Sequence, residues 1–181
     1  MILLARHGET ESNRERRFQG QLDVPLSDTG REQARALAEQ AAAEERPIVA
    51  LYTSPLIRAR ETADVVGARL GLEPRPDPRL VEVDVGDWQR RLKDDVERDD
   101  PDDWAAFLRA GAHFRFPGGE SFGEQQERVV AALVDITQRG ELPALVVCHR
   151  GVVRCALAHT HKRGLDTYHE WDVANGELLR L

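Results

Sequence analysis

The chain has 181 residues, of which 41% are hydrophobic and 31% charged, and its formal net charge is −7. This length and composition predict one globular domain over residues 1–181 and exclude a broad basic surface for nucleic acid or an anionic membrane. No apolar run approaches the roughly 20 residues that a membrane span needs, and two cysteines make no disulfide framework, which favours a cytoplasmic location.

Buried strands and helices alternate in the first half of the chain. Residues 2–5 predict a short strand, and Ser27 is a cap candidate for the helix that follows. A second buried strand is expected at about 48–52. The Ser54 hydroxyl, followed by a proline, predicts the start of a helix over 56–70.

The second half of the chain contains a polar insertion before the alternation resumes. Residues 83–118 are acidic and broken by proline, which predicts short helices outside the core. A strand over 142–148 and a helix over 150–161 follow, and two terminal strands are expected around Asn175. Between the insertion and that strand lies a long amphipathic helix whose predicted apolar face is Phe122, Val129, Val130, Leu133, Val134 and Ile136.

Strands that alternate with helices predict an α/β fold, a three-layer α/β/α sandwich with a mainly parallel sheet. Ligands bind such sheets beyond the carboxyl ends of the strands. The first strand ends in Arg6 and His7, the second is followed by Arg58, and the third ends in His149 and Arg150. Together with the start of the helix after Pro55, these cations and imidazoles predict an anion site.

Several stretches in a fixed order resemble the histidine phosphatase superfamily, also called the phosphoglycerate mutase-like family. They are LARHGETESN, RRFQGQLDVPLSDTGREQA, YTSPLIRARETA, LVEVDVGDW, PGGES and VVCHRGVVR. The resemblance covers nearly the whole chain. It implies a phosphoryl-transfer enzyme with a phosphohistidine intermediate and a phosphoglycerate mutase-like fold.

The resemblance also implies roles for individual residues. His7 matches the nucleophile, Glu82 the proton donor, and Arg6, Arg58 and His149 the phosphate pocket. The positions that line the substrate site match Asn13, Gln19 and Gly20.

Elementary chemistry is consistent with these roles. An imidazole nucleophile must be neutral, and the cations around His7 disfavour a further positive charge. Arginines can neutralise the phosphate oxygens, so the scheme needs no metal and no cofactor. By spacing alone, Glu73, Asp84 and Asp87 rival Glu82 as the proton donor.

The stretch CHRGVVR also fits Cys-x-x-Gly-x-x-Arg, the loop signature of cysteine-dependent phosphatases. In that alternative Cys148 is the nucleophile and Arg154 the phosphate clamp. It leaves RHGET and Glu82 without a role, so we favour the histidine mechanism.

Other charged residues have simpler interpretations. His159 and His161 lie two apart on a helix, which points them to different faces and disfavours a metal pair. Arg60 is expected to be a solvated helix charge, whereas Arg14 and Arg17 either border the pocket or lie on the surface.

The sequence departs from the family pattern near the predicted pocket. Gln89 and Arg90 replace an acidic residue and a glycine that many members have after the tryptophan, and Arg150 replaces a residue that is often glycine. These changes bear on substrate shape and on activity, so a binding or regulatory module with little catalysis remains an alternative.

The acidic insertion decides between two reactions at this stage. A mutase that resembles this chain would grip a second anionic group with a basic insertion, whereas an acidic cover should repel that group. We therefore expect a phosphomonoesterase for a small phosphorylated substrate, similar to short members such as α-ribazole phosphatase. Phosphoglycerate mutase is the alternative, and a homodimer is a candidate assembly.

Overall fold

The computed structural model describes residues 1–181 and contains one five-stranded sheet. The strands are ordered β3-β2-β4-β1-β5. β1 and β2 both pair parallel with β4, β3 pairs parallel with β2, and β5 pairs antiparallel with β1. The predicted mainly parallel sheet is confirmed. The strand bounds are β1 Ile2–Arg6, β2 Ala50–Thr53, β3 Arg75–Pro76, β4 Ala144–Cys148 and β5 Leu178–Arg180.

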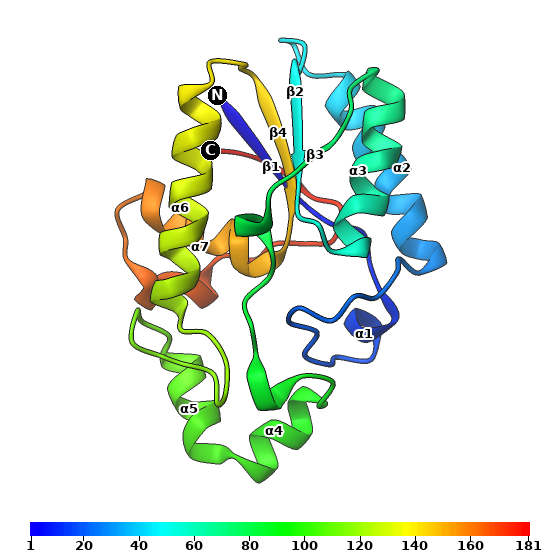
Figure 1. Cartoon of the computed structure of the whole chain (residues 1–181). Helices are drawn as coiled ribbons and strands as arrows, with labels where there is room; N and C mark the ends of the chain where they lie inside the picture. Colours follow the sequence, from blue (N-terminus) through cyan, green and yellow to red (C-terminus); the bar gives the residue numbers. More distant parts are fainter.

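Helices cover both faces of the sheet, as Figure 1 shows. α2 (Asp28–Ala42) and α3 (Ile57–Leu70) lie on one face, and α6 (Phe122–Gln138) and α7 (Arg150–Thr160) lie on the other. Side chains of successive strand residues alternate between two apolar clusters. In β1, Leu3 packs with the α2 and α3 side, whereas Leu4 packs with the α6 and α7 side. The predicted three-layer arrangement is therefore present.

The shorter elements gather at the carboxyl end of the parallel strands. They are α1 (Glu11–Arg14), α4 (Lys93–Asp99) and α5 (Pro101–Arg109), which Figure 1 places below the sheet. Two 3-10 helices, η1 (Pro78–Leu80) and η2 (Gly86–Trp88), lead into this region. We call residues 83–118 the cap.

The cap contains the predicted short helices, but the expectation that it lies outside the core is wrong. Trp88, Val96 and Phe116 are almost completely buried and belong to the same apolar cluster as Leu4 and Val146 of the sheet. The aromatic rings of Trp88 and Phe116 contact each other edge to face, with centroids 5.4 Å apart. The cap is therefore continuous with the main core.

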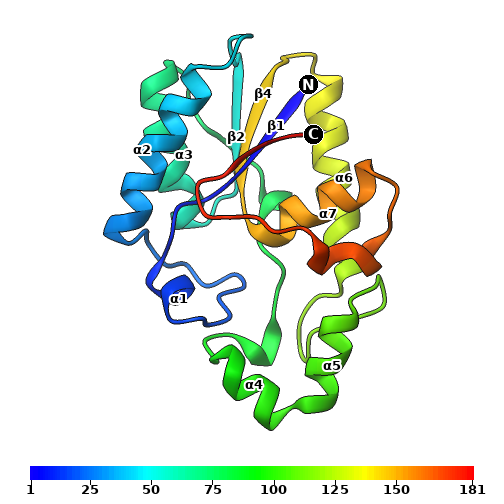
Figure 2. The same cartoon turned by 180° about the vertical axis from the view of Figure 1, so that it is seen from behind.

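The end of the chain also differs from its prediction. Residues before Asn175 form a 3-10 helix, η3 (Leu165–Glu170), and an irregular stretch, so β5 is a single terminal strand. The Val173 carbonyl accepts a hydrogen bond from Arg6 Nη1 at 2.7 Å, which removes it from any sheet ladder. Figure 2 shows this segment, in red, crossing to β5 beside the N-terminus.

The long helix α6 has the predicted amphipathic character with two exceptions, Val130, which is only partly buried, and Val134. Phe122, Val129, Leu133 and Ile136 are buried, but Val134 is 46% exposed. No helix in the structure is long and apolar enough to cross a membrane.

Candidate active site

A pocket of about 420 Å³ lies between the carboxyl ends of the strands and the cap. Segments far apart in the sequence meet there because parallel strands deliver the residues that follow them to one edge of the sheet. Seven of the eight predicted site residues line this pocket: Arg6, His7, Asn13, Gln19, Gly20, Arg58 and Glu82.

His7 follows the last residue of β1 and is only 3% exposed. Its Nδ1 lies 2.6 Å from the Gly8 carbonyl oxygen, so this nitrogen carries the proton and donates it. Its Nε2 then holds the lone pair and accepts a hydrogen bond from Arg58 Nε at 3.3 Å. The nitrogen that can act as a nucleophile therefore faces the pocket cations.

Burial lowers the pKa of His7 well below its ordinary value, and the nearby Arg58 and Arg6 charges lower it further. The Gly8 hydrogen bond opposes this shift without reversing it. His7 is thus a neutral imidazole at neutral pH, which is the form that nucleophilic attack requires.

The two arginines beside His7 are buried cations held by backbone carbonyls. Arg58 donates to the Leu22 oxygen at 2.6 Å and to the Gly20 oxygen at 2.8 Å. Arg6 binds the Val173 carbonyl, and its Nε is buried without a hydrogen-bond partner. Burial lowers the pKa of Arg6 to about 9, with Arg150 contributing, and that of Arg58 to about 10. An anion beside the two arginines would offset the free-energy cost of burying their charges.

His149 lies behind His7 and does not line the pocket. Its side chain is fully buried, and its ring centroid is 5.2 Å from that of His7. Its Nε2 is 2.7 Å from Ser54 Oγ, whereas its Nδ1 has no partner. Burial, followed by the charge of Arg58, lowers its pKa well below the ordinary value, so His149 carries a single N–H.

The Ser54 contact explains why the predicted cap at the start of α3 is wrong. The N-cap residue of α3 is Leu56, without a side-chain cap bond. Ser54 Oγ accepts from the Leu56 N–H at 3.3 Å and lies against His149 instead. Asp23 accepts the Ile57 N–H at 2.6 Å, so a carboxylate of the protein occupies this helix terminus. The helix after Pro55 therefore offers fewer free N–H groups to an anion than expected.

Glu82 is anchored at the N-terminus of α7 rather than free in the pocket. Its carboxylate accepts from the Val83 N–H at 2.9 Å, from Gln125 Nε2 at 3.1 Å and from the Gly151 N–H at 3.2 Å. A Cβ at position 151 would lie 2.3 Å from Glu82 Oε1, so any other residue there would displace the Glu82 carboxylate. Of its rivals by spacing, Glu73, Asp84 and Asp87 do not line the pocket.

The remaining predicted residues form the wall next to His7. Thr10 Oγ1 donates to Gln19 Oε1 at 2.9 Å, and Asn13 Oδ1 accepts from the Thr10 N–H at 3.1 Å. Asn175, which the sequence analysis placed only in a turn, donates to the His7 carbonyl at 3.0 Å and also lines the pocket.

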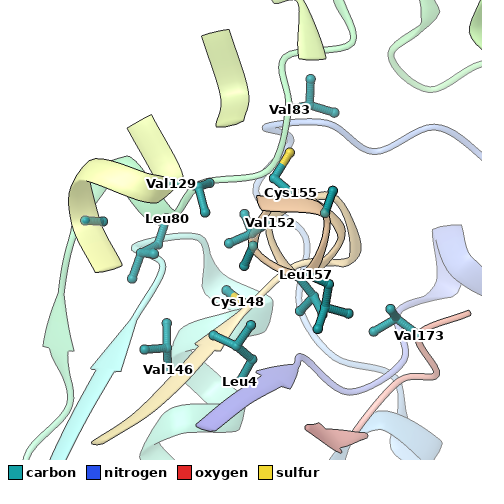
Figure 3. Packing of buried hydrophobic residues seen from close by; sticks show 14 of the residues in the cluster. Leu4, Leu80, Val83, Val129, Val146, Cys148, Val152, Cys155, Leu157 and Val173 are labelled. Carbon is teal, nitrogen blue, oxygen red and sulfur yellow. The ribbon is translucent and has the colours of Figure 1, made fainter. Parts of the chain in front are cut away.

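The cysteine alternative has no support in the geometry. Cys148 is fully buried in β4 and is absent from the pocket wall. Figure 3 shows Cys148 and Cys155 among apolar side chains, including Val146, Val152 and Leu157. Burial raises the pKa of the Cys148 thiol above its ordinary value, which disfavours the thiolate that such a mechanism needs.

The pocket is more basic than the sequence analysis anticipated. Arg17 lines it, whereas Arg14 does not, and further cations reach it from α4 and α7. Its only carboxylates are Glu9 and Glu82. The cationic side chains in its wall are Arg6, Arg16, Arg17, Arg58, Lys93, Arg150 and Arg154.

The expectation of an acidic, repelling cover is wrong. None of the acidic residues of α4 and α5 lines the pocket. Asp95 and Asp99 instead pair with Arg98 at 2.9 and 2.8 Å, and Asp100 pairs with Arg91. The net charge of a segment does not reveal which of its faces meets the pocket, and here that face presents Lys93 and Phe107.

Other polar residues in the chain form no comparable site. No group of three or more His, Cys, Asp or Glu side chains lies close enough to hold a metal ion. Arg60, His113, His159 and His161 are exposed.

The family model of the histidine phosphatase superfamily, branch 1, matches residues 2–181. The chain belongs to this superfamily. Among curated relatives of this histidine phosphatase, phosphoglycerate mutase-like protein 4 of Arabidopsis thaliana is 40% identical over 157 residues, covering 84% of the chain and 67% of the relative. The probable phosphoglycerate mutase GpmB of an Enterobacter species is 40% identical over 148 residues, covering 80% of the chain and 67% of the relative.

Solved structures share the fold of this histidine phosphatase. A mycobacterial glucosyl-3-phosphoglycerate phosphatase superposes with a TM-score of 0.88 at 30% identity, covering 98% of the chain and 90% of the neighbour. YhfR of Bacillus stearothermophilus gives a TM-score of 0.89 at 33% identity, covering 98% and 88%. The α-ribazole phosphatase of Shigella flexneri gives 0.84 at 26% identity, covering 98% and 87%. The predicted superfamily and α/β class are confirmed.

Proposed function

We propose that the chain is a phosphomonoesterase that hydrolyses small phosphate esters through a phosphohistidine on His7. The observation that carries this proposal is the state of His7. Its Nδ1 proton is fixed on the Gly8 carbonyl, and its Nε2 faces Arg58 in a cationic pocket. A neutral, oriented imidazole among buried cations suits attack on a dianionic phosphate.

In the first step the Nε2 lone pair attacks phosphorus, a nitrogen–phosphorus bond forms and the ester phosphorus–oxygen bond breaks. Arg58 and Arg6 stabilise the charge on the equatorial oxygens, with the unpartnered Nε of Arg6 as one donor. His149 packs against His7 with ring centroids 5.2 Å apart and supports the imidazole from behind.

Glu82 enters the first step as a carboxylic acid, supplies the proton that the departing alkoxide needs and is left as a carboxylate. The Gly151, Gln125 and Val83 donors hold its carboxyl group in position at the pocket wall. In the second step the same carboxylate takes a proton from water, which attacks phosphorus and breaks the nitrogen–phosphorus bond. Inorganic phosphate leaves, and Asn13, Gln19 and Gly20 border the substrate in both steps.

The proposal includes the organisation of the chain. Residues 1–181 act as a single histidine phosphatase domain in which the cap, residues 83–118, closes the substrate pocket. The substrate is a small phosphorylated molecule, the setting is cytoplasmic, and a homodimer is the candidate assembly.

Phosphoglycerate mutase remains the second candidate, because two observations favour it. Curated relatives carry that name, and the pocket is basic where an acidic cover was expected. Incubation with 3-phosphoglycerate and its bisphosphate activator separates the reactions. A phosphatase releases inorganic phosphate, whereas a mutase forms 2-phosphoglycerate.

The central test concerns His7. His7→Ala should lower turnover of phosphate esters by ~10³-fold or more, because the attacking nitrogen is lost. The unaltered protein should trap an acid-labile phosphoryl group that peptide mapping places on His7. His113→Ala is the control, since this histidine is exposed and lies outside the pocket. Near-normal activity of His7→Ala would refute the proposed mechanism.

A further inference from the structure

Five cations in the pocket wall are not used by the steps proposed above, and two of them, Arg16 and Arg17, pair with carboxylates. The other three are Lys93, the first residue of α4, and Arg150 and Arg154, which lie one turn apart at the start of α7. No carboxylate pairs with any of the three. Cations on a protein surface are usually solvated, but these line a partly enclosed pocket, so their mutual repulsion is less screened.

The two arginines differ in how they are held. Arg154 Nε donates to the Trp171 carbonyl at 2.8 Å, and its guanidinium lies 5.3 Å from the centroid of the Tyr168 ring. Arg154 is thereby fixed in place. Arg150 makes no side-chain hydrogen bond, and its Nε is buried without a partner. A buried N–H without an acceptor costs free energy unless a ligand satisfies it.

Lys93 approaches the same region from the cap. Its ammonium group lies 5.7 Å from the centroid of the Phe18 ring. Burial lowers its pKa to about 8, and the charges of Arg150, Arg154 and Arg6 contribute to the shift. Because neighbouring cations destabilise the charged form of Lys93, an anion placed among them would stabilise it.

The cations closest to His7 already suffice for one phosphate group. Arg6 and Arg58 flank the imidazole, whereas Lys93, Arg150 and Arg154 come from α4 and α7. The pocket wall therefore carries more positive charge than Arg6 and Arg58 alone supply.

We infer that Lys93, Arg150 and Arg154 form a second anion-binding subsite, and that the preferred substrates are phosphate esters with a further anionic group. The shared chemistry of that group is a carboxylate or a second phosphate. The inference rests on the proposed function, since it names the substrate class of the same pocket. Arg150, at a position where the family pattern often has glycine, gives this chain a cation that such members lack.

Equilibrium binding tests the subsite without relying on turnover. We would use the His7→Ala protein and isothermal titration calorimetry with two matched pairs of ligands. Glycerol 3-phosphate and 3-phosphoglycerate differ by a carboxylate, and fructose 6-phosphate and fructose 1,6-bisphosphate differ by a phosphate. The ligand with the extra anionic group should bind about 10- to 100-fold more tightly, the usual value of charge-assisted hydrogen bonds. The pair that shows the larger preference identifies the anionic group.

Substitutions connect that preference to the named side chains. Arg150→Gln and, separately, Lys93→Gln in the His7→Ala protein should each reduce the preference by about tenfold. Arg60→Gln is the matched control because Arg60 is exposed on α3, outside the pocket. Equal affinities within both pairs, or a preference that survives Arg150→Gln and Lys93→Gln, would overturn the inference. A protein that shows the preference but has no His7-dependent turnover would instead overturn the proposed function alone.

Discussion

The proton-donor role that we propose for Glu82 depends on the leaving group. A general acid matters when the ester expels a strongly basic alkoxide and matters little when it expels nitrophenolate. Glu82→Gln should therefore cost ~10²- to 10⁴-fold in kcat/KM for alkyl phosphates, the usual range for general acid catalysis. The loss in the phosphorylation step for nitrophenyl phosphate should be far smaller. The measurement is the pre-steady-state release of nitrophenol, set beside steady-state turnover of an alkyl ester.

Asp84→Asn is a suitable control for that experiment. Asp84 is two residues away, accepts the Gly86 N–H at 3.0 Å and does not line the pocket. Its substitution should leave the ratio of the two substrates unchanged. If Glu82→Gln reduces both substrates equally, Glu82 shapes the pocket and is not the proton donor.

Cys148 gives a second prediction at the scale of one residue. Because the thiol is fully buried in β4 and its pKa is raised by burial, it serves packing and not chemistry. Cys148→Ser should keep phosphatase activity within about tenfold, an effect of at most about 1.4 kcal/mol on the activation barrier. Iodoacetamide should not inactivate the native protein. Loss of activity in Cys148→Ser combined with full activity in His7→Ala would select the cysteine mechanism.

Individual residues show how far the sequence could predict the site. Arg6, His7 and Arg58 were predictable because each lies at or just beyond the carboxyl end of a predicted strand. Ser54 was misassigned as a helix cap, since its contact with His149 spans 95 positions along the chain and leaves no local signal. Gln125 was missed for the same reason, because its contact with Glu82 joins α6 to a distant loop.

At the scale of elements, the cap depends on the main core. α4 and α5 have seven and nine residues, too few to be stable alone, so packing must hold them in place. Their aromatic and aliphatic contacts join the cluster that covers one face of the sheet. We therefore expect the cap and the sheet to unfold together.

Phe116→Ala tests this coupling. Phe116 is 1% exposed and packs on Phe18, Trp88 and Phe122, so truncation should lower the free energy of unfolding by about 3 to 5 kcal/mol. Urea unfolding followed by tryptophan fluorescence and by far-UV circular dichroism should give one coincident transition. Leu108→Ala in α5 is the control, because Leu108 is 54% exposed and its loss should cost less than about 0.5 kcal/mol. Two separate transitions would show that the cap unfolds independently.

The elements that the sequence predicted poorly share a physical cause. The stretch that ends in Val173 resembles a strand in composition, but Tyr168 stacks on Phe122 with centroids 4.1 Å apart. That contact and the Arg6 bond to Val173 are tertiary and override local propensity. The central strands were predictable because burial on both faces demands continuous apolar runs, as in Ala144–Cys148.

At the scale of the whole molecule, the opposite charges are separated in space. The chain has a net charge of −7, yet its pocket is lined by seven cations and two carboxylates. Acidic side chains of the cap do not line the pocket and pair with arginines, such as Asp99 with Arg98 at 2.8 Å and Asp94 with Arg16 at 3.2 Å. The pocket can therefore attract a small anion although the protein as a whole is acidic.

Buried histidines also make the stability of the molecule depend on pH. The pKa values of His7, His149 and His169 are all lowered, in each case mainly by burial. An unfolded histidine takes up a proton near pH 6.5, about its ordinary pKa, whereas these three stay neutral in the folded protein to lower pH. The unfolded state then binds more protons below about pH 6.5, so acid favours unfolding there.

His149 allows that dependence to be measured for one group. Each such histidine should make the free energy of unfolding fall by up to about 1.4 kcal/mol for every pH unit below about pH 6.5. Well above that pH the same histidine should not make the free energy of unfolding depend on pH. Urea unfolding between about pH 5 and pH 7 measures the slope, in a range above the ordinary carboxylate pKa values. His149→Gln removes a titrating group and should make the slope shallower by about 1.4 kcal/mol per pH unit in the acid part of that range, whatever its effect on stability at pH 7. His113→Gln, in which an exposed histidine is replaced, should leave the slope as it is. An unchanged slope in His149→Gln would mean that His149 is protonated in the folded protein, and the single N–H assigned to it would then be wrong.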